Sequence, residues 1–134
     1  MIIGIDFDNT IACHEKSFRN LALSKGFVPE GDENPKETLK RGFLGQNAAN
    51  VLWTEAQAEV YGKRLSSAKV FDEFPSFLSK AVSLDHKVVI ISLRTIYPAL
   101  GGYINLHDAA IAWLFENSLM SPKRILRENC FFET

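Results

Sequence analysis

The sequence predicts an α/β domain built on a parallel sheet. Short apolar segments occur at 2–7, 87–92 and 129–133, the first two rich in β-branched residues, and helical patterns separate them along the chain. This alternation of strands and helices is typical of parallel sheets whose strands are joined by crossover helices. The length of 134 residues suits one ordinary domain, which we assign to residues 1–134.

The three predicted strands differ in length and in how deeply we expect them to lie. Residues 2–7 are almost continuously apolar, which is typical of a central parallel strand covered on both faces. Residues 87–92 predict a second buried strand, and residues 129–133 a short third one. A sheet of three strands leaves an edge exposed, so we expect residues 130–132 to pair with another chain, which would make a homo-oligomer.

Between the strands, five stretches have apolar residues at helical spacing. Pro35 and Asn105 are suited to begin two of these helices, and Gly26 to end the first. The third stretch predicts the longest helix, and residues 94–104 predict a long loop. The predicted helices cover residues 14–25, 35–44, 48–67, 77–86 and 105–119.

The connection between the first two strands is much longer than a crossover requires. A parallel connection needs a dozen or more residues, whereas this one runs from residue 8 to residue 86. We therefore expect residues 14–74, approximately, to form a small helical insertion above the sheet, similar to a cap. The predicted architecture is a Rossmann-like parallel sheet with flanking helices and this insertion after the first strand.

Composition and charge exclude several classes of protein. The chain is 46% hydrophobic and 23% charged with a net charge of −1, so it lacks the basic surface of a nucleic-acid-binding protein. No apolar run approaches the roughly 18 residues of a membrane-spanning helix, and we find no secretory signal. Cys13 and Cys130 are the only cysteines, which predicts free thiols in a reduced, cytoplasmic protein.

Two acids, Asp6 and Asp8, come at the end of the first strand. Ligands of open parallel sheets bind beyond the carboxyl ends of the strands, and alternate residues of a strand share a face. Two buried carboxylates repel each other unless a cation or a shared proton compensates. Mg²⁺ is the simplest partner, since it prefers oxygen ligands, water and phosphate. The alternative is that Asp8-Asn9-Thr10 only forms a turn.

The segment DFDNT, residues 6–10, resembles the first motif, DxDx[TV], of the haloacid-dehalogenase-like (HAD) superfamily. The resemblance implies that Asp6 is a nucleophile that takes up a phosphoryl group and that Asp8 is a general acid and base. It also implies that the Asp6 side chain and the Asp8 backbone carbonyl hold Mg²⁺. A carboxylate can form an acyl phosphate that water then hydrolyses, so the implied chemistry is coherent.

Ser92 closes the second strand, where the superfamily has the Ser or Thr of its second motif. Together with Thr10 of the first motif, it is expected to bind phosphate oxygens. Arg94 is expected to contact phosphate or substrate as well, or else to lie solvated at the surface. Residues 53–65, 97–114 and 130–133 further resemble a subgroup of uncharacterised bacterial HAD-like hydrolases.

The superfamily has two more elements, a Lys that balances the nucleophile and phosphate charges and an acidic pair after a later strand. After Ser92 the chain has a single lysine, Lys123, and Glu133 ends the third strand. One interpretation, which we favour, is that the chain is a fragment of a longer protein. A second is that Lys123 and Glu133 stand in for the missing groups, and a third is that another subunit completes the site.

The sequence therefore predicts a HAD-like phosphatase, a hydrolase of phosphoric monoesters that acts on a phosphorylated small molecule of unknown identity. The alternative is a non-catalytic binding or interaction protein that keeps the same fold. We expect His14 and His107 to be surface residues, and Trp53 and Tyr61 to pack within the core of the insertion.

Overall fold

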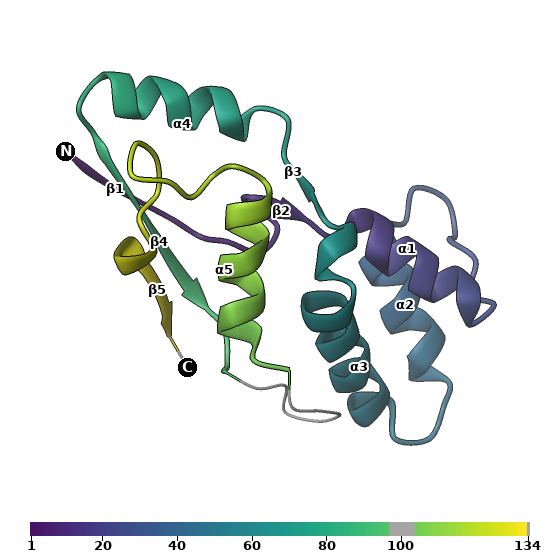
Figure 1. Ribbon diagram of the computed structural model, residues 1–134. Coiled ribbons are helices and arrows are strands. Elements are labelled where there is room, and N and C mark those ends of the chain that lie inside the picture. Colours follow the sequence, from purple (N-terminus) through teal and green to yellow (C-terminus); the bar gives the residue numbers. More distant parts are fainter. Residues whose placement is uncertain (97–103, 134) are drawn as a thin grey trace.

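The computed structural model, which describes residues 1–96 and 104–133, has a mixed α/β architecture (Figure 1). Strands β1 (Ile2–Ile5), β4 (Lys87–Leu93) and β5 (Cys130–Glu133) form a parallel sheet in the order β1-β4-β5. The central strand is β4, which pairs through Ile90 with Ile5 on one side and through Leu93 with Glu133 on the other. The three predicted strands and their parallel arrangement are confirmed.

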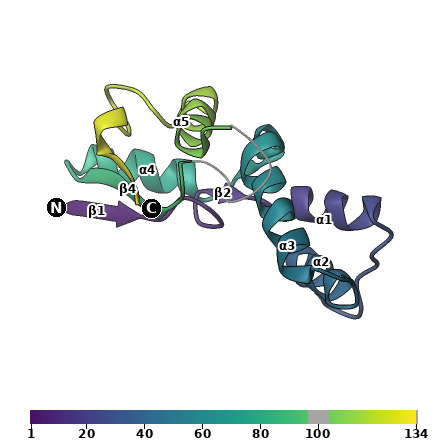
Figure 2. The same cartoon turned by 90° about the horizontal axis from the view of Figure 1, so that it is seen from below.

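Helices α4 (Phe74–Ser83) and α5 (Leu106–Glu116) cover one face of this sheet. Both crossovers lead across the sheet in the same direction, and right-handed crossovers then place both helices on the same side. Figure 2 shows α5 above the sheet in that view, with no helix below β1. The main core is the layer between this face and the two helices, and its largest fully buried members are Phe7, Ile11, Leu78, Ile90, Leu114, Leu119 and Ile125.

The prediction that residues 2–7 form a central strand covered on both faces is wrong. Strand β1 ends at Ile5 and, among the described residues, pairs only with β4. Ile2 is 67% exposed, because its face of the sheet carries no helix. A continuous apolar run does not distinguish a covered face from an apolar face that is left open.

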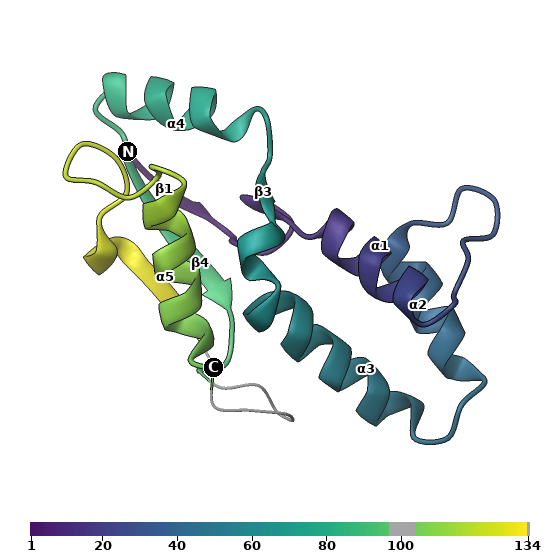
Figure 3. The ribbon, with the colours of Figure 1, turned by 45° about the vertical axis from the view of Figure 1, so that its right-hand side comes forward.

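Helices α1 (Glu15–Ser24), α2 (Pro35–Leu44) and α3 (Ala49–Ala58) lie beside the sheet, as Figures 1 and 3 show. Their core is separate from the main core and is formed around Phe18, Leu39 and Phe43. The chain enters and leaves this group through an antiparallel ribbon of β2 (Ala12–Cys13) and β3 (Lys69–Val70), which the sequence did not predict. We call residues 14–68, between the two ribbon strands, the helical insertion.

The predicted long helix over residues 48–67 is interrupted. After α3 the chain forms a π-helical turn, η1 (Glu59–Lys63), and then a 3-10 turn, η2 (Leu65–Ser67). Gly62 lies in the π-helical turn and packs against α5, where a Cβ atom would lie 3.2 Å from Leu106 Cδ2. Glycine weakens a regular helix. Together with the close contact to α5, it accounts for the change from α-helix to π-helical turn in this part of the chain.

The other four predicted helices form within a few residues of their expected bounds, and η3 (Arg127–Asn129) precedes β5. Most of the predicted loop 94–104 falls on residues 97–103, outside the described residues. Both cysteines are free, as predicted. Nowhere in residues 1–96 and 104–133 is a helix both long and apolar enough to cross a membrane.

Candidate active site

The two predicted acids lie where β1 ends and the chain turns toward the helical insertion. Asp6 is exposed, and its Oδ1 accepts a hydrogen bond of 2.8 Å from the backbone N–H of Phe7. Asn9 adopts a left-handed conformation with φ of 62° and donates its backbone N–H to the Ala12 carbonyl at 2.8 Å. The segment does form a turn, but this turn leaves the Asp8 carboxylate free to contact other parts of the protein.

Arg94 binds the Asp8 carboxylate from the end of the neighbouring strand. Its Nη1 donates to the two carboxylate oxygens at 2.7 and 2.8 Å. Its Nε donates to the Leu106 carbonyl at 3.0 Å, its Nη2 donates to the Tyr61 carbonyl, and its guanidinium carbon lies 5.3 Å from the centre of the Phe7 ring. Arg94 is only 5% exposed, so the interpretation of a solvated surface arginine is wrong.

His14 is the second partner of Asp8, and the expectation of a surface position for it is also wrong. The residue is completely buried, and its Nε2 lies 2.7 Å from Asp8 Oδ1. Its ring packs edge-to-face against Tyr61, with 4.9 Å between the ring centres. Nδ1 has no hydrogen-bond partner among the described residues. His14 directly follows β2, whose Ala12 is buried, and the sequence holds no pattern that indicates the burial of His14.

These contacts hold Asp8 as a carboxylate. Burial by itself would raise the pKa of Asp8, but the hydrogen bond from His14 and the charge of Arg94 together lower this pKa below its usual value. Burial, followed by the nearby Asp8 charge, raises the pKa of Tyr61. At neutral pH Asp8 is therefore an acceptor of hydrogen bonds, which weighs against the role of proton donor that the resemblance implies.

The remaining predicted phosphate-binding residues are placed differently. Thr10 is exposed in the turn after β1, and Ser92 is 4% exposed on the core-facing side of β4. His107, expected at the surface, is partly buried, and its Nε2 contacts the Arg94 carbonyl. The structure thus brings Asp8, His14 and Arg94 together, while Asp6 and Thr10 face outward.

Lys123 does not belong to this site. It lies in the loop between α5 and β5, and a helix that joins two parallel strands ends near their amino ends. Asp6 lies at the carboxyl end of β1, so Lys123 and Asp6 are at opposite ends of the sheet. Lys123 therefore does not take the place of the lysine that the resemblance calls for. Glu133 is at the carboxyl end of β5, where it pairs in register with Leu93, and β4 separates it from β1.

A cavity of about 310 Å³ adjoins the Asp8–Arg94 pair. One wall comes from the carboxyl end of β4 and the other from the helical insertion, so a molecule bound there would contact both parts. Its lining residues are Asp8, Thr54, Gln57, Ala58, Tyr61, Leu93, Arg94, Thr95 and Leu106.

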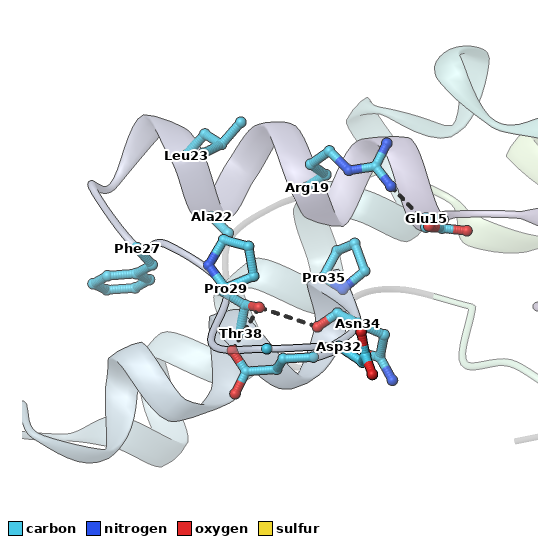
Figure 4. A pocket seen from close by; sticks show the side chains of 12 residues that line it. Glu15, Arg19, Ala22, Leu23, Phe27, Pro29, Asp32, Asn34, Pro35 and Thr38 are labelled. Atoms are coloured by element: carbon cyan, nitrogen blue, oxygen red, sulfur yellow. Dashed lines mark hydrogen bonds and ion pairs between the residues drawn. The ribbon is translucent and has the colours of Figure 1, made fainter.

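A second pocket, of about 460 Å³, lies within the helical insertion and contains none of the predicted site residues (Figure 4). Its wall comes from α1, the loop that follows and the start of α2. Two ion pairs lie at its wall: Arg19 with Glu15 at 2.8 Å, and Glu33 with Arg41 at 2.9 Å. This pocket is larger than the cavity beside Asp8 and Arg94.

The Mg²⁺ ligands that the resemblance implies are the Asp6 carboxylate, which is exposed at the end of β1, and the Asp8 backbone carbonyl. Mg²⁺ is commonly coordinated by one or two protein carboxylates together with waters and phosphate oxygens, and this small set of donors agrees with that preference. Within the described parts of the chain, no group of three or more His, Cys, Asp or Glu side chains is placed to hold a metal.

No family model, no curated protein and no solved structure matches this chain. Membership of the HAD superfamily therefore stays a prediction that rests on the DFDNT segment and its position after β1.

Proposed function

We propose that this chain is a HAD-like phosphohydrolase scaffold that binds a phosphorylated small molecule at the carboxyl ends of β1 and β4. The observation that carries the proposal is the position of Asp6, an exposed carboxylate directly after a strand of a parallel sheet. Ligands of such sheets bind at that edge. Two residues further along the chain, the Asp8–Arg94 pair and the cavity that it lines supply a polar, partly enclosed surface.

In the proposed reaction an Asp6 carboxylate oxygen attacks the phosphorus atom. The bond to the leaving oxygen breaks, and an aspartyl phosphate forms, which water hydrolyses to inorganic phosphate and free Asp6. Mg²⁺, when bound to the Asp6 carboxylate and the Asp8 carbonyl, would neutralise phosphate charge. Arg94 and His14 fix the turn that carries Asp6, because both hold Asp8, two residues further on.

A second candidate function is non-catalytic binding of a phosphorylated molecule, and one observation favours it. The Asp8 carboxylate is engaged by Arg94 and His14, and its pKa is lowered. A carboxylate held in this state is a poor source of the proton that an alkoxide leaving group needs. The two candidates differ in whether phosphate is released.

The deciding experiment measures hydrolysis of para-nitrophenyl phosphate by the chain, with and without Mg²⁺. This ester suits the test because its phenolate leaves without being protonated. We expect phosphate release that Asp6→Asn abolishes. The matched control is Asp85→Asn, since Asp85 is exposed in the turn just before β4 and has a φ of 62° that Asn also adopts. Release that survives Asp6→Asn would contradict the proposed nucleophile.

If neither the wild-type chain nor Asp85→Asn releases phosphate, titration calorimetry with inorganic phosphate and Mg²⁺ tests the second candidate, the binding protein. Binding that Asp6→Asn weakens would support the binding protein. Absence of both hydrolysis and binding would reject both functions for this chain.

A further inference from the structure

The pocket within the helical insertion is separate from the proposed phosphate site. It lies between α1, the loop of residues 25–34 and the first turn of α2 (Figure 4). Among the described residues, none that lines this pocket also lines the cavity beside Asp8 and Arg94. Its volume of about 460 Å³ is typical of pockets that hold small molecules. We call it the insertion pocket.

The loop that forms one wall of the insertion pocket is tied to α2 by side chains. Arg41 donates hydrogen bonds to the Glu33 carboxylate at 2.9 Å and to the Val28 carbonyl at 2.6 Å. Thr38, which is 2% exposed, donates its hydroxyl to the Glu33 carboxylate at 2.7 Å. These bonds hold the loop in one shape. A wall that is ordered before binding lowers the entropic cost of holding a ligand.

One end of the insertion pocket is apolar. Ala22 and Leu23 of α1 line this end together with Phe27 and Pro29 of the loop. The Phe27 ring packs edge-to-face against Phe43, with 5.6 Å between the ring centres, so it is held in place. Leu23 is 54% exposed, and no other part of the described chain covers it. A ligand that covers this end with hydrocarbon gains free energy from the hydrophobic effect.

The polar part of the insertion pocket has more acids than bases around it. Glu15 pairs with Arg19 of α1 at 2.8 Å. Arg41 is shared by two carboxylates of the loop, Glu33 at 2.9 Å and Glu30 at 3.4 Å. Both arginines are therefore engaged, and among the described residues no lysine lines the pocket. The pocket keeps a negative charge as a result.

Asp32 is the acid that no described residue neutralises. It lines the pocket and is exposed, and within the part of the chain that the structure describes it makes neither an ion pair nor a hydrogen bond. In Figure 4, Asp32 and Asn34 lie together, away from Leu23 and Phe27. A pocket with hydrocarbon at one end and a free carboxylate at the other is complementary to a cation that carries an apolar body.

We infer that the insertion pocket binds a small organic cation, namely a free primary amine on a short apolar body. The ammonium group lies beside Asp32, and the apolar body covers Leu23 and Phe27. Phosphorylated molecules are excluded from this pocket, because their charge has the same sign as that of Asp32. Binding of the amine does not depend on the proposed phosphate site, so the two can be tested separately.

The test is a titration of the isotope-labelled chain with phenethylamine, followed by the backbone amide signals in two-dimensional NMR. We expect saturable shifts centred on residues 19–38 and a dissociation constant of about 1 mM or tighter. Phenethyl alcohol has the same size without the charge and should bind at least about threefold more weakly. Hydrocinnamate, which carries a carboxylate in place of the ammonium, should bind at least about tenfold more weakly.

Two substitutions test the two ends of the pocket. Asp32→Asn should weaken the binding of phenethylamine about threefold, as expected for a solvent-exposed ion pair, and the control Asp85→Asn should leave it unchanged. Leu23→Arg should weaken it at least about tenfold, because the longer side chain fills the apolar end and adds a like charge. Its control is Leu44→Arg, since Leu44 is 78% exposed at the end of α2 and does not line the pocket.

Several results would overturn the inference. Shifts that fail to saturate, or equal affinities for the amine, the alcohol and the carboxylate, would reject a cation site. Shifts centred on Tyr61 and Arg94 would place the amine in the other cavity. A capped peptide Gly-Lys-Gly that binds more tightly than phenethylamine would mean that the pocket takes a lysine side chain of another protein. Binding that Leu23→Arg leaves unchanged would show that the apolar end is not used.

Discussion

The guanidinium of Arg94 and the carboxylate of Asp8 join two points of the chain that are 86 residues apart. Nη1 of Arg94 lies 2.7 Å from one carboxylate oxygen and 2.8 Å from the other, and the Arg94 side chain is 3% exposed. The same arginine donates to carbonyls of Tyr61 in the insertion and Leu106 in α5. One side chain therefore connects β4, the turn after β1, α5 and the helical insertion.

We predict that Arg94→Ala lowers the free energy of unfolding by about 3 kcal/mol, because removal of one partner leaves a largely buried carboxylate uncompensated. Urea unfolding followed by circular dichroism measures this change. The control is Arg19→Ala, which breaks the 2.8 Å pair with Glu15 in which both side chains are more than half exposed. That change should stay within about 0.5 kcal/mol. Equal losses for the two variants would contradict a special role for Arg94.

A double-mutant cycle isolates the pair itself. Asp8→Asn alone and Arg94→Ala alone should each destabilise, and the double variant should lose less than the sum of the two. Additive losses would mean that the contacts of Arg94 with the Tyr61 and Leu106 carbonyls, rather than the charge pair, carry its contribution.

We predict that Gly42→Ala destabilises the protein although alanine is the better helix former. A Cβ atom at Gly42 in α2 would overlap the ring of Phe27, which packs edge-to-face against Phe43, so this ring must move. Overpacking costs about 1–3 kcal/mol, which exceeds the gain in helix propensity of about 1 kcal/mol. Thermal unfolding compares it with Gly45→Ala, where no atom lies within 4 Å. A higher melting temperature for Gly42→Ala than for the wild type would disprove this packing.

Glu33 makes the stability of the insertion depend on pH. The hydrogen bond from Arg41, followed by that from Thr38, lowers the pKa of Glu33 from 4.5 to about 2. A carboxylate with a lowered pKa stabilises the fold above its unfolded pKa and loses that contribution as the pH falls from about 4.5 toward 2. Urea midpoints at pH 6 and pH 3 should therefore differ less in Glu33→Gln than in the wild type. Glu55→Gln, on the exposed side of α3, serves as the control and should keep the wild-type difference.

Cys130 should react slowly with alkylating reagents at neutral pH. Burial raises the pKa of its thiol from 9.0 to about 11, and the thiolate is the reactive form. In a Cys13→Ser background, we expect the rate of reaction with iodoacetamide to keep rising up to about pH 11. A plateau close to pH 9 would contradict this prediction, because it would mean that the pKa of the Cys130 thiol is not raised.

Apolar pattern and capping residues were sufficient to predict most of the elements. Pro35 begins α2, and the Asn105 side chain accepts a hydrogen bond from the Asp108 N–H at the start of α5. The two-residue strands β2 and β3 could not be predicted, because they belong to no periodic run. Ala12 pairs with Val70, and Cys13 with Lys69, only through tertiary folding. The exposure of Ile2 was missed for a related reason, since the sequence of a strand does not indicate whether another part of the protein covers each of its faces.

The site was predictable only in part. The positions of Asp6 and Asp8 at a strand end follow from the local sequence. The partners of Asp8 do not, because His14 and Arg94 reach it from different elements and only the tertiary fold brings them together. Opposite charges after neighbouring parallel strands, here Asp8 and Arg94, were the available indication of a pair. Lys123 was assigned by elimination, and the path of the chain through α5 places it at the far end of the sheet.

The ribbon of β2 and β3 has a consequence for how this protein can be rebuilt. Ala12 pairs with Val70 and Cys13 with Lys69, so the two points where the chain leaves and rejoins the sheet domain are adjacent. A short hairpin turn grafted between them, or a helical segment from another protein, is long enough to close the chain at this ribbon. The insertion is thus joined to the rest of the protein at a single narrow place in the chain path, although His14 and Tyr61 also connect it to Asp8 and Arg94.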